Sequence, residues 1–291
     1  MIRLSILHRT LYRYRGPVAL SPHRLLLRPR ESRNLRLLSH EVTTDPPGRI
    51  VWARDVAGNA VATAAFERTT DRLEIVSRSE VELHAVAWPI FDIAAEAIVF
   101  PFAISDDDRT DLGALPFPQH PDPDGRLGRW AWGFVLGART DTLSLLKDLC
   151  AGVAGALVYR SREEEGARPP LDTLDRGEGS CRDFAVLFAE AARALGFGAR
   201  LVSGYLHDRE GTGLTGSAGA GSTHAWAEIY LPGAGWVAFD PTNRSVGGAD
   251  LIPVAVARDI AQATPVSGRF AGPEGAAGTL EVEVQVTAVP A

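Results

Sequence analysis

The sequence has few cysteines and no long hydrophobic run, and each scarcity excludes a class of protein. Two cysteines among 291 residues, Cys150 and Cys181, cannot form a disulfide framework. No stretch reaches the ~18 consecutive apolar residues of a transmembrane helix. Met1 to Gly16 also lacks the apolar core and the small-residue cleavage site of a signal peptide. We therefore expect a cytoplasmic protein with reduced thiols and no membrane partner.

Basic residues are also fewer than acidic residues, which argues against nucleic acid as a partner. The chain holds 30 lysines and arginines against 36 acidic residues, a net charge of -6. The exception is a basic segment from Arg3 to Arg36, which contains one acid, Glu31. Because arginine alternates there with leucine, isoleucine and tyrosine, we interpret this segment as the solvated face of half-buried strands. A surface for a polyanion or another partner is the alternative.

The content of 45% hydrophobic and 23% charged residues is that of a folded globular protein, and a length of 291 residues suggests about two domains. The strand and helix patterns along the chain predict an α+β protein. Short alternating runs separated by Gly, Pro and Asn predict an antiparallel β-sandwich over residues 1–85. Residues 86–138 are predicted to be a connector, because their prolines and consecutive aspartates disfavour both helix and sheet. Residues 139–291 form the predicted second domain, with helices expected over 140–157 and 181–195 and strands over 200–206, 226–231, 236–239 and 279–289.

The two cysteines have different places in these expected helices. Cys150 falls in an apolar stripe at helical spacing, which predicts a small buried thiol. Cys181 opens its helix after the N-cap candidate Ser180, and Asp183 is interpreted as an acid at the helix start. Unpaired N–H groups and the positive end of the helix dipole favour a thiolate there and can receive an oxyanion. Cys181 is therefore a candidate nucleophile, with a helix-capping cysteine as the alternative.

Two further residues are placed to assist Cys181. His224 starts a strand, and Asp240 ends the strand after the next turn. A five-residue turn from Leu231 to Gly235 would bring both side chains to one face of the sheet, whereas a four-residue turn would put them on opposite faces. We select the first register because of the chemistry: His224 would take the thiol proton and later protonate a leaving amine, and Asp240 would orient the imidazole. Taken singly, each residue has a structural interpretation.

Three segments around these residues resemble the signature blocks of the transglutaminase-like superfamily: Gly177–Phe184, Thr223–Trp226 and Trp236–Thr242. Residues 1–83 resemble the β-rich N-terminal region of bacterial members, and residues 252–259 and 268–270 are similar to the tail of that subfamily. The resemblance implies a papain-like catalytic core in residues 139–291, in which a helix bearing the cysteine packs on an antiparallel sheet. It implies the roles of nucleophile, base and orienting acid for Cys181, His224 and Asp240. It also implies an upstream side chain that completes the oxyanion hole, a role to which no residue is assigned.

The resemblance implies thioacyl chemistry without selecting the acceptor. Bacterial relatives of this architecture are regarded as cysteine proteases, so we predict a protease or amidase that acts on a protein or peptide substrate without a metal or cofactor. The alternatives are a protein-glutamine gamma-glutamyltransferase and a non-catalytic interaction scaffold. The glycine-rich loop 210–222, which leads to His224, is expected to be mobile and to act either as a lid or as a plain connector. The substrate and the oligomeric state stay open.

Overall fold

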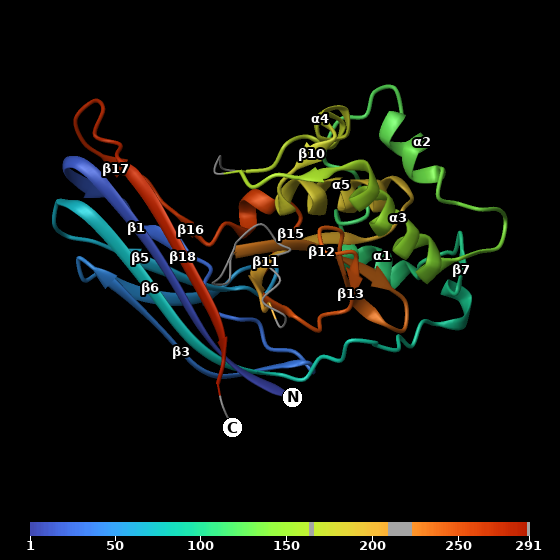
Figure 1. The fold of residues 1–291 in the computed structure, drawn as a ribbon, viewed down its shortest axis with the longest axis horizontal. Coiled ribbons are helices and arrows are strands. Elements are labelled where there is room, and N and C mark those ends of the chain that lie inside the picture. Colours follow the sequence, from blue (N-terminus) through green and yellow to red (C-terminus); the bar gives the residue numbers. More distant parts are fainter. Residues whose placement is uncertain (163–165, 209–222, 290–291) are drawn as a thin grey trace.

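The computed structural model describes residues 1–162, 166–208 and 223–289. Figure 1 shows two halves side by side, with long strands from both ends of the chain in one half and helices covering a sheet in the other. The predicted α+β class is confirmed.

The first sheet contains strands from both ends of the chain. All its pairings are antiparallel, in the order β17-β1-β6-β3, with β18 also paired to β1. In β1, alternation buries Leu4 and Ile6 and leaves arginines outside, where Arg13 lies 3.6 Å from Glu281 of β18. This part of the basic segment is therefore a solvated strand face whose arginines pair across strands. The strands are β1 (Ile2–Leu20), β3 (Leu35–Asp45), β6 (Thr70–Leu83), β17 (Phe270–Ala271) and β18 (Thr279–Ala288).

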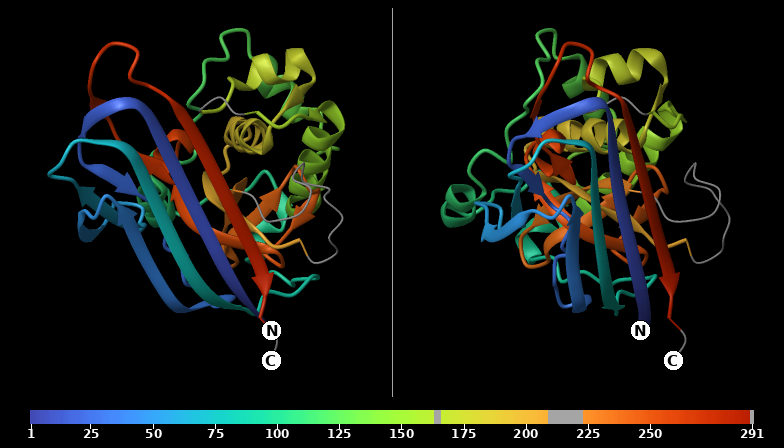
Figure 2. Two further views of the ribbon diagram at one scale, coloured as in Figure 1. Left: turned by 60° about the vertical axis from the view of Figure 1, so that its left-hand side comes forward. Right: turned by 90° about the vertical axis from the view of Figure 1, so that its left-hand side faces the viewer.

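Strand β18 differs from the expected domain organisation. We expected this C-terminal strand to belong with the catalytic half, in residues 139–291. Instead it runs antiparallel to Leu4–Arg13 of β1, and both views in Figure 2 show it beside that strand. The period of a strand indicates which of its faces is buried but not which strand is its neighbour, so the pattern alone assigns no partner.

A second antiparallel sheet, of order β16-β2-β5-β4, packs against the first. Its residues Leu25 and Ala62 share an apolar cluster with Val18 of β1 and Ile75 of β6. Both sheets therefore bury their inner faces in one core. The strands are β2 (His23–Leu25), β4 (Arg49–Arg54), β5 (Ala60–Ala65) and β16 (Val266–Ser267).

The predicted connector contains more regular structure than its composition suggests. It holds β7 (Val99–Phe100), the 3-10 turn η1 (Ala95–Ala97), α1 (Asp106–Leu112) and α2 (Arg126–Trp132). The side chain of Ser105 accepts the Asp108 N–H at 3.1 Å, and three aspartates occupy the first turn of α1. Acids at a helix N-terminus are stabilising, so the aspartates that argued against a helix in fact support one. The four prolines from Pro116 to Pro123 lie between the two helices.

In the half of the molecule that contains most helices, a five-stranded sheet of order β14-β13-β12-β11-β15 packs against helix α5. The helix is buried on almost every side, and its Phe188 packs on Phe239 of β13 with ring centroids 5.4 Å apart. The helices and strands predicted for this half are present within a few residues of their expected ends. None of the helices in the described ranges has the length and hydropathy needed to cross a bilayer. The elements are β8 (Thr140–Asp141), α3 (Thr142–Ala156), β9 (Val158–Tyr159), α4 (Pro170–Arg176), β10 (Glu178–Gly179), α5 (Cys181–Ala194), β11 (Ala199–Leu206), β12 (Thr223–Leu231), β13 (Gly235–Asp240), β14 (Ser245–Val246), β15 (Leu251–Ala257) and η2 (Ile260–Ala263).

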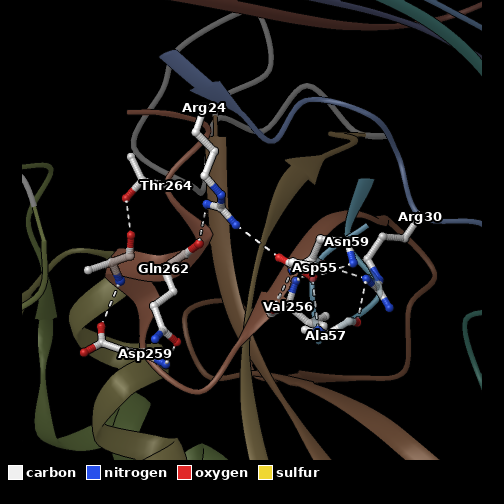
Figure 3. Close-up of polar contacts among 10 residues, drawn as sticks. Arg24, Arg30, Asp55, Ala57, Asn59, Val256, Asp259, Gln262 and Thr264 are labelled. Carbon is white, nitrogen blue, oxygen red and sulfur yellow. Dashed lines mark hydrogen bonds and ion pairs between the residues drawn. The ribbon is translucent and has the colours of Figure 1, made fainter. Parts of the chain in front are cut away.

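A polar contact docks the N-terminal half onto the edge strand β15 (Figure 3). The Asn59 carboxamide donates to the Val256 carbonyl at 2.8 Å and accepts the Val256 N–H at 2.9 Å. Asp55 in turn accepts from the Asn59 side chain and from Arg24. Asn59 thus satisfies the backbone groups that a neighbouring strand would otherwise pair, which closes this part of the sheet edge.

Candidate active site

Cys181 is the first residue of α5, as predicted. The preceding residue, Ser180, donates its N–H and its hydroxyl to the Asp183 carboxylate, at 2.8 and 2.9 Å. Cys181 itself is a free thiol that is partly accessible. The thiol therefore lies at the positive end of a fixed helix, where a thiolate is favoured and where unpaired N–H groups gather.

Asp183 has the role of a helix-start acid. Its other carboxylate oxygen accepts the Arg168 N–H at 2.7 Å and the Arg162 guanidinium at 3.1 Å. The side chain is fully buried. These contacts with backbone N–H groups and an arginine agree with the interpretation of Asp183 as an acid at the helix start, and they orient the carboxylate toward the segment before α5.

His224 and Asp240 lie on the neighbouring strands β12 and β13. The ladder pairs Tyr230 with Trp236 and Ala227 with Phe239, which is the register selected from the chemistry. The imidazole Nε2 lies 2.8 Å from Asp240 Oδ2, and both side chains are buried. Since Nε2 is engaged by the carboxylate, Nδ1 is the ring nitrogen left for the thiol.

The charges of the three side chains favour an ion pair. Burial raises the pKa of Cys181, but the hydrogen bond and charge of His224 outweigh burial and lower it overall. Burial lowers the pKa of His224, whereas the charge and hydrogen bond of Asp240, with a contribution from Cys181, raise it to about 10. The pKa of Asp240 is likewise lowered against burial by His224. These opposite shifts favour a thiolate beside an imidazolium over a neutral thiol beside a neutral imidazole.

Asn243 is a member of the site that sequence reasoning missed. Its side-chain N–H donates to Asp240 Oδ2 at 2.6 Å and lies 3.5 Å from His224 Nε2. The other oxygen of Asp240 accepts the backbone N–H groups of Thr242 and Asn243, at 3.0 and 3.3 Å. An Asp followed by a turn with Asn three residues later is a signal for such local contacts, and it could have suggested this residue.

Tyr159 is a second residue near the thiol that the sequence did not single out. It pairs with Gly179 in the short parallel ladder of β9 and β10, and its ring centroid lies 6.3 Å from that of Phe184. Burial, together with the charge of Cys181, raises the pKa of Tyr159 to about 12. The phenol is therefore protonated at neutral pH and is available as a donor.

Cys150 lies outside the site, in the core. It is 1% exposed on α3, and burial raises the pKa of its thiol. This agrees with the predicted structural thiol. Among the described residues, no cluster of three or more His, Cys, Asp or Glu side chains could hold a metal ion. The loop 210–222, predicted to be a lid or a connector, lies outside the described residues.

Comparison with protein families matches both halves of the chain. Residues 4–82 match the bacterial transglutaminase-like N-terminal region, and residues 129–241 match the transglutaminase-like superfamily. The half of the chain that contains α5, β12 and β13 thus resembles the transglutaminase-like superfamily. The matched range contains Cys181, His224 and Asp240, and the resemblance expected from the three sequence blocks is confirmed. This match supports a general thiol-dependent enzyme.

Two mycobacterial proteins are similar to this chain along almost all of its length. An uncharacterized protein of Mycobacterium tuberculosis is 29% identical over 279 residues, which cover 91% of this chain and 87% of the relative. An uncharacterized protein of Mycobacterium leprae is 27% identical over 287 residues, 99% of each chain. The fold is shared with the crystal structure of a candidate cysteine protease from Cytophaga hutchinsonii, with a TM-score of 0.74 at 21% identity, over 100% of this chain and 91% of that one.

Proposed function

We propose that the protein is an acyl-transfer enzyme that cleaves peptide or amide bonds through Cys181, His224 and Asp240, and that water is its usual acceptor. The observation that carries this proposal is the imidazole held by hydrogen bonds to both the thiol and a buried carboxylate. Since the proton of the thiol already belongs to the imidazole, the nucleophile needs no further activation.

In the acylation step, the Cys181 thiolate attacks the carbonyl carbon of the substrate. The negative charge that develops on the carbonyl oxygen would be received by the free N–H groups at the start of α5. As the carbon–nitrogen bond breaks, the His224 imidazolium gives its proton to the leaving amine. Asp240 keeps Nε2 protonated and holds the ring in place, with Asn243 fixing the carboxylate.

In the deacylation step, neutral His224 takes a proton from the acceptor, which attacks the thioester. Water yields a carboxylic acid and a primary amine yields a new amide, and in both cases the thiolate leaves and the imidazolium is restored. The name of the Cytophaga hutchinsonii protein supports hydrolysis, which is why water is the proposed acceptor. Transfer from glutamine to an amine is the second candidate, supported by the superfamily match.

Mass spectrometry of the intact protein separates these possibilities. The protein is incubated with glutaminyl peptides, with and without a primary amine, and both the protein and the peptides are weighed. We expect an acyl adduct on Cys181 and a deamidated or cleaved peptide even when amine is present. A peptide joined to the amine would instead establish the transferase. Absence of an adduct in the wild type, at the same level as in Cys181→Ala, would contradict both enzymatic functions and favour a scaffold.

A further inference from the structure

A cleft of about 460 Å³ lies between the two halves of the molecule. One wall is formed by residues 30–35 and 83–91, from the N-terminal half and the segment that leaves it. The other wall is formed by β12, β13 and the turn at Gly247 and Gly248. Cys181, His224 and Asp240 are not among the residues that line this cleft, so it is separate from the thiol site.

Trp226 of β12 lines the cleft and holds a buried hydrogen-bond donor without a partner in the described part of the chain. The residue is 1% exposed, and its indole N–H has no acceptor among the described residues. A buried donor without a partner costs about 1 to 3 kcal/mol, so a small shift of the cleft wall that let a ligand acceptor reach this N–H would be favourable. The ring also stacks on His224, with centroids 6.1 Å apart, so one residue that lines the cleft is a neighbour of the imidazole.

Two arginines from different halves meet at this cleft. Arg200 of β11 lies over the Trp236 ring at 4.1 Å and donates to Glu228 at 2.7 Å. Arg30 comes from the N-terminal half and donates to Asn59 and to the Ala57 carbonyl (Figure 3). Burial and then the nearby charge of Arg200 lower the pKa of Arg30, and the charges of Glu228 and Asp55 oppose this shift without cancelling it. An additional carboxylate would complete this compensation.

The opposite wall provides apolar contact area. Val86 and Ile90 both line the cleft and are 60% and 90% exposed. Exposed aliphatic side chains beside a groove are typical of surfaces that receive a ligand. The cleft thus combines an apolar wall, a free donor and paired arginines.

We propose that this cleft is a binding site for an acidic peptide segment, with a peptide carbonyl on the Trp226 N–H, a carboxylate between Arg30 and Arg200, and aliphatic side chains against Val86 and Ile90. The site would hold a part of a polypeptide other than the acyl group transferred to Cys181. Peptide binding at this site depends on the residues that line the cleft and not on the proposed chemistry of the thiol.

Fluorescence anisotropy with Cys181→Ala protein tests binding without turnover. The probe is a short labelled peptide that alternates leucine and glutamate and ends in a free carboxylate. Its control has glutamine in place of glutamate and an amidated end. We expect saturable binding of the acidic peptide, at least about tenfold tighter than the control. Equal binding of the two peptides, or no saturation by the acidic one, would overturn the proposal.

Substitutions of residues that line the cleft test whether the peptide binds there. Gly248 lines the cleft, and a Cβ at this position would meet open space. Gly248→Glu is therefore expected to fold and to weaken acidic-peptide binding about tenfold by repulsion, whereas Gly248→Gln has the same size without the charge. Arg30→Gln should weaken binding as well, and Arg13→Gln, on the outer face of β1, is the matched control.

Binding that is unchanged in Gly248→Glu and Arg30→Gln would place the peptide elsewhere and reject the cleft. Labelling of Cys181 by iodoacetamide in the wild type reports on the thiol independently. Failure of the cleft proposal and failure of the proposed function therefore give different results.

Discussion

The two cysteines lie on helices that pack together, and their thiol pKa values are shifted in opposite directions. Cys150 sits in the interior of α3, where apolar neighbours raise the pKa of its thiol. Cys181 sits at the start of α5, where its pKa is lowered although burial opposes the change. Both helices belong to the same core. The difference therefore arises from position along the helix and from His224, which a distant strand supplies.

This comparison shows what makes a thiol reactive in this fold. The helix start provides free N–H groups, but the same end would only be a cap without the imidazole. The imidazole in turn remains cationic because Asp240 is buried beside it. In the proposed mechanism, the reactivity of Cys181 therefore depends on three elements, α5, β12 and β13.

The largest effect is expected in alkylation of the two thiols. With limiting iodoacetamide at neutral pH, Cys181 should be labelled at least ~10³-fold faster than Cys150, because one is a thiolate and the other a buried thiol. Peptide mapping by mass spectrometry measures both rates. Equal rates in the native protein, or faster labelling of Cys150, would remove the assignments of both cysteines.

The pH dependence of this labelling sharpens the same comparison. The lowered pKa of Cys181 and the raised pKa of His224 keep the ion pair intact through neutral pH. It is lost on the acid side when the thiolate is protonated, and on the basic side as His224 deprotonates near pH 10. Between pH 8 and pH 6 the rate should change little, whereas an ordinary thiol of pKa about 8.5 slows roughly 80-fold. Cys181 that follows the ordinary profile would have no ion pair.

The next effect concerns the carboxylate that keeps His224 charged. Asp240→Asn should slow acylation of Cys181 by about 10² to 10⁴-fold, because the neutral amide no longer favours the imidazolium or its orientation. Single-turnover acylation by an activated ester measures this step. The variant should also make labelling at pH 6 much slower than at pH 8. A variant with wild-type acylation and a flat pH profile would exclude Asp240 from the site.

How far the sequence predicts this site depends on the range of the contacts. The cap at Ser180 and the apolar period of α5 are local, so the place of Cys181 at the helix start is predictable. The register of β12 and β13 was chosen for chemical reasons, because both turn lengths were compatible with the pattern. Tyr159 was missed because its approach to Cys181 depends on the pairing of β9 with β10.

In the fold as well, local features are predictable from the sequence and long-range contacts are not. Strands of the N-terminal half and helices of the catalytic half appear in the hydrophobic periods, whereas partners distant in the sequence do not. Thus β18 was recognised as a strand and assigned to the wrong half. The contact of Asn59 with Val256 is likewise invisible in sequence, since it joins residues 197 positions apart.

A smaller effect, on stability, separates the two buried aspartates of the site. Asp183 accepts four donors at the base of α5, so Asp183→Asn should lower the free energy of unfolding by about 2 kcal/mol. Turnover per folded molecule should change little, because the carboxylate does not contact His224. Urea unfolding measures the first quantity and active-site titration the second. Asp148→Asn, on the exposed side of α3, is the control and should be near neutral.

A result in which Asp183→Asn abolishes acylation at unchanged stability would reverse the roles of Asp183 and Asp240. Such a result would also mean that the start of α5 contributes charge to the reaction rather than only a rigid position for Cys181.

The smallest effect is expected from Asn243, which acts on the imidazole through Asp240. Asn243→Ala removes the 2.6 Å hydrogen bond to the carboxylate but leaves the two backbone N–H groups that hold its other oxygen. Acylation should therefore slow by only about tenfold, roughly the worth of one hydrogen bond to a charged group. The acid limb of the labelling profile should also shift, because a less restrained Asp240 stabilises the imidazolium differently. Ser245→Ala, an exposed neighbour on β14, should leave both the rate and the profile unchanged. If Asn243→Ala lowers stability with no shift in the profile, Asn243 merely shapes the turn, and the ion pair of Cys181 rests on Asp240 and His224 alone.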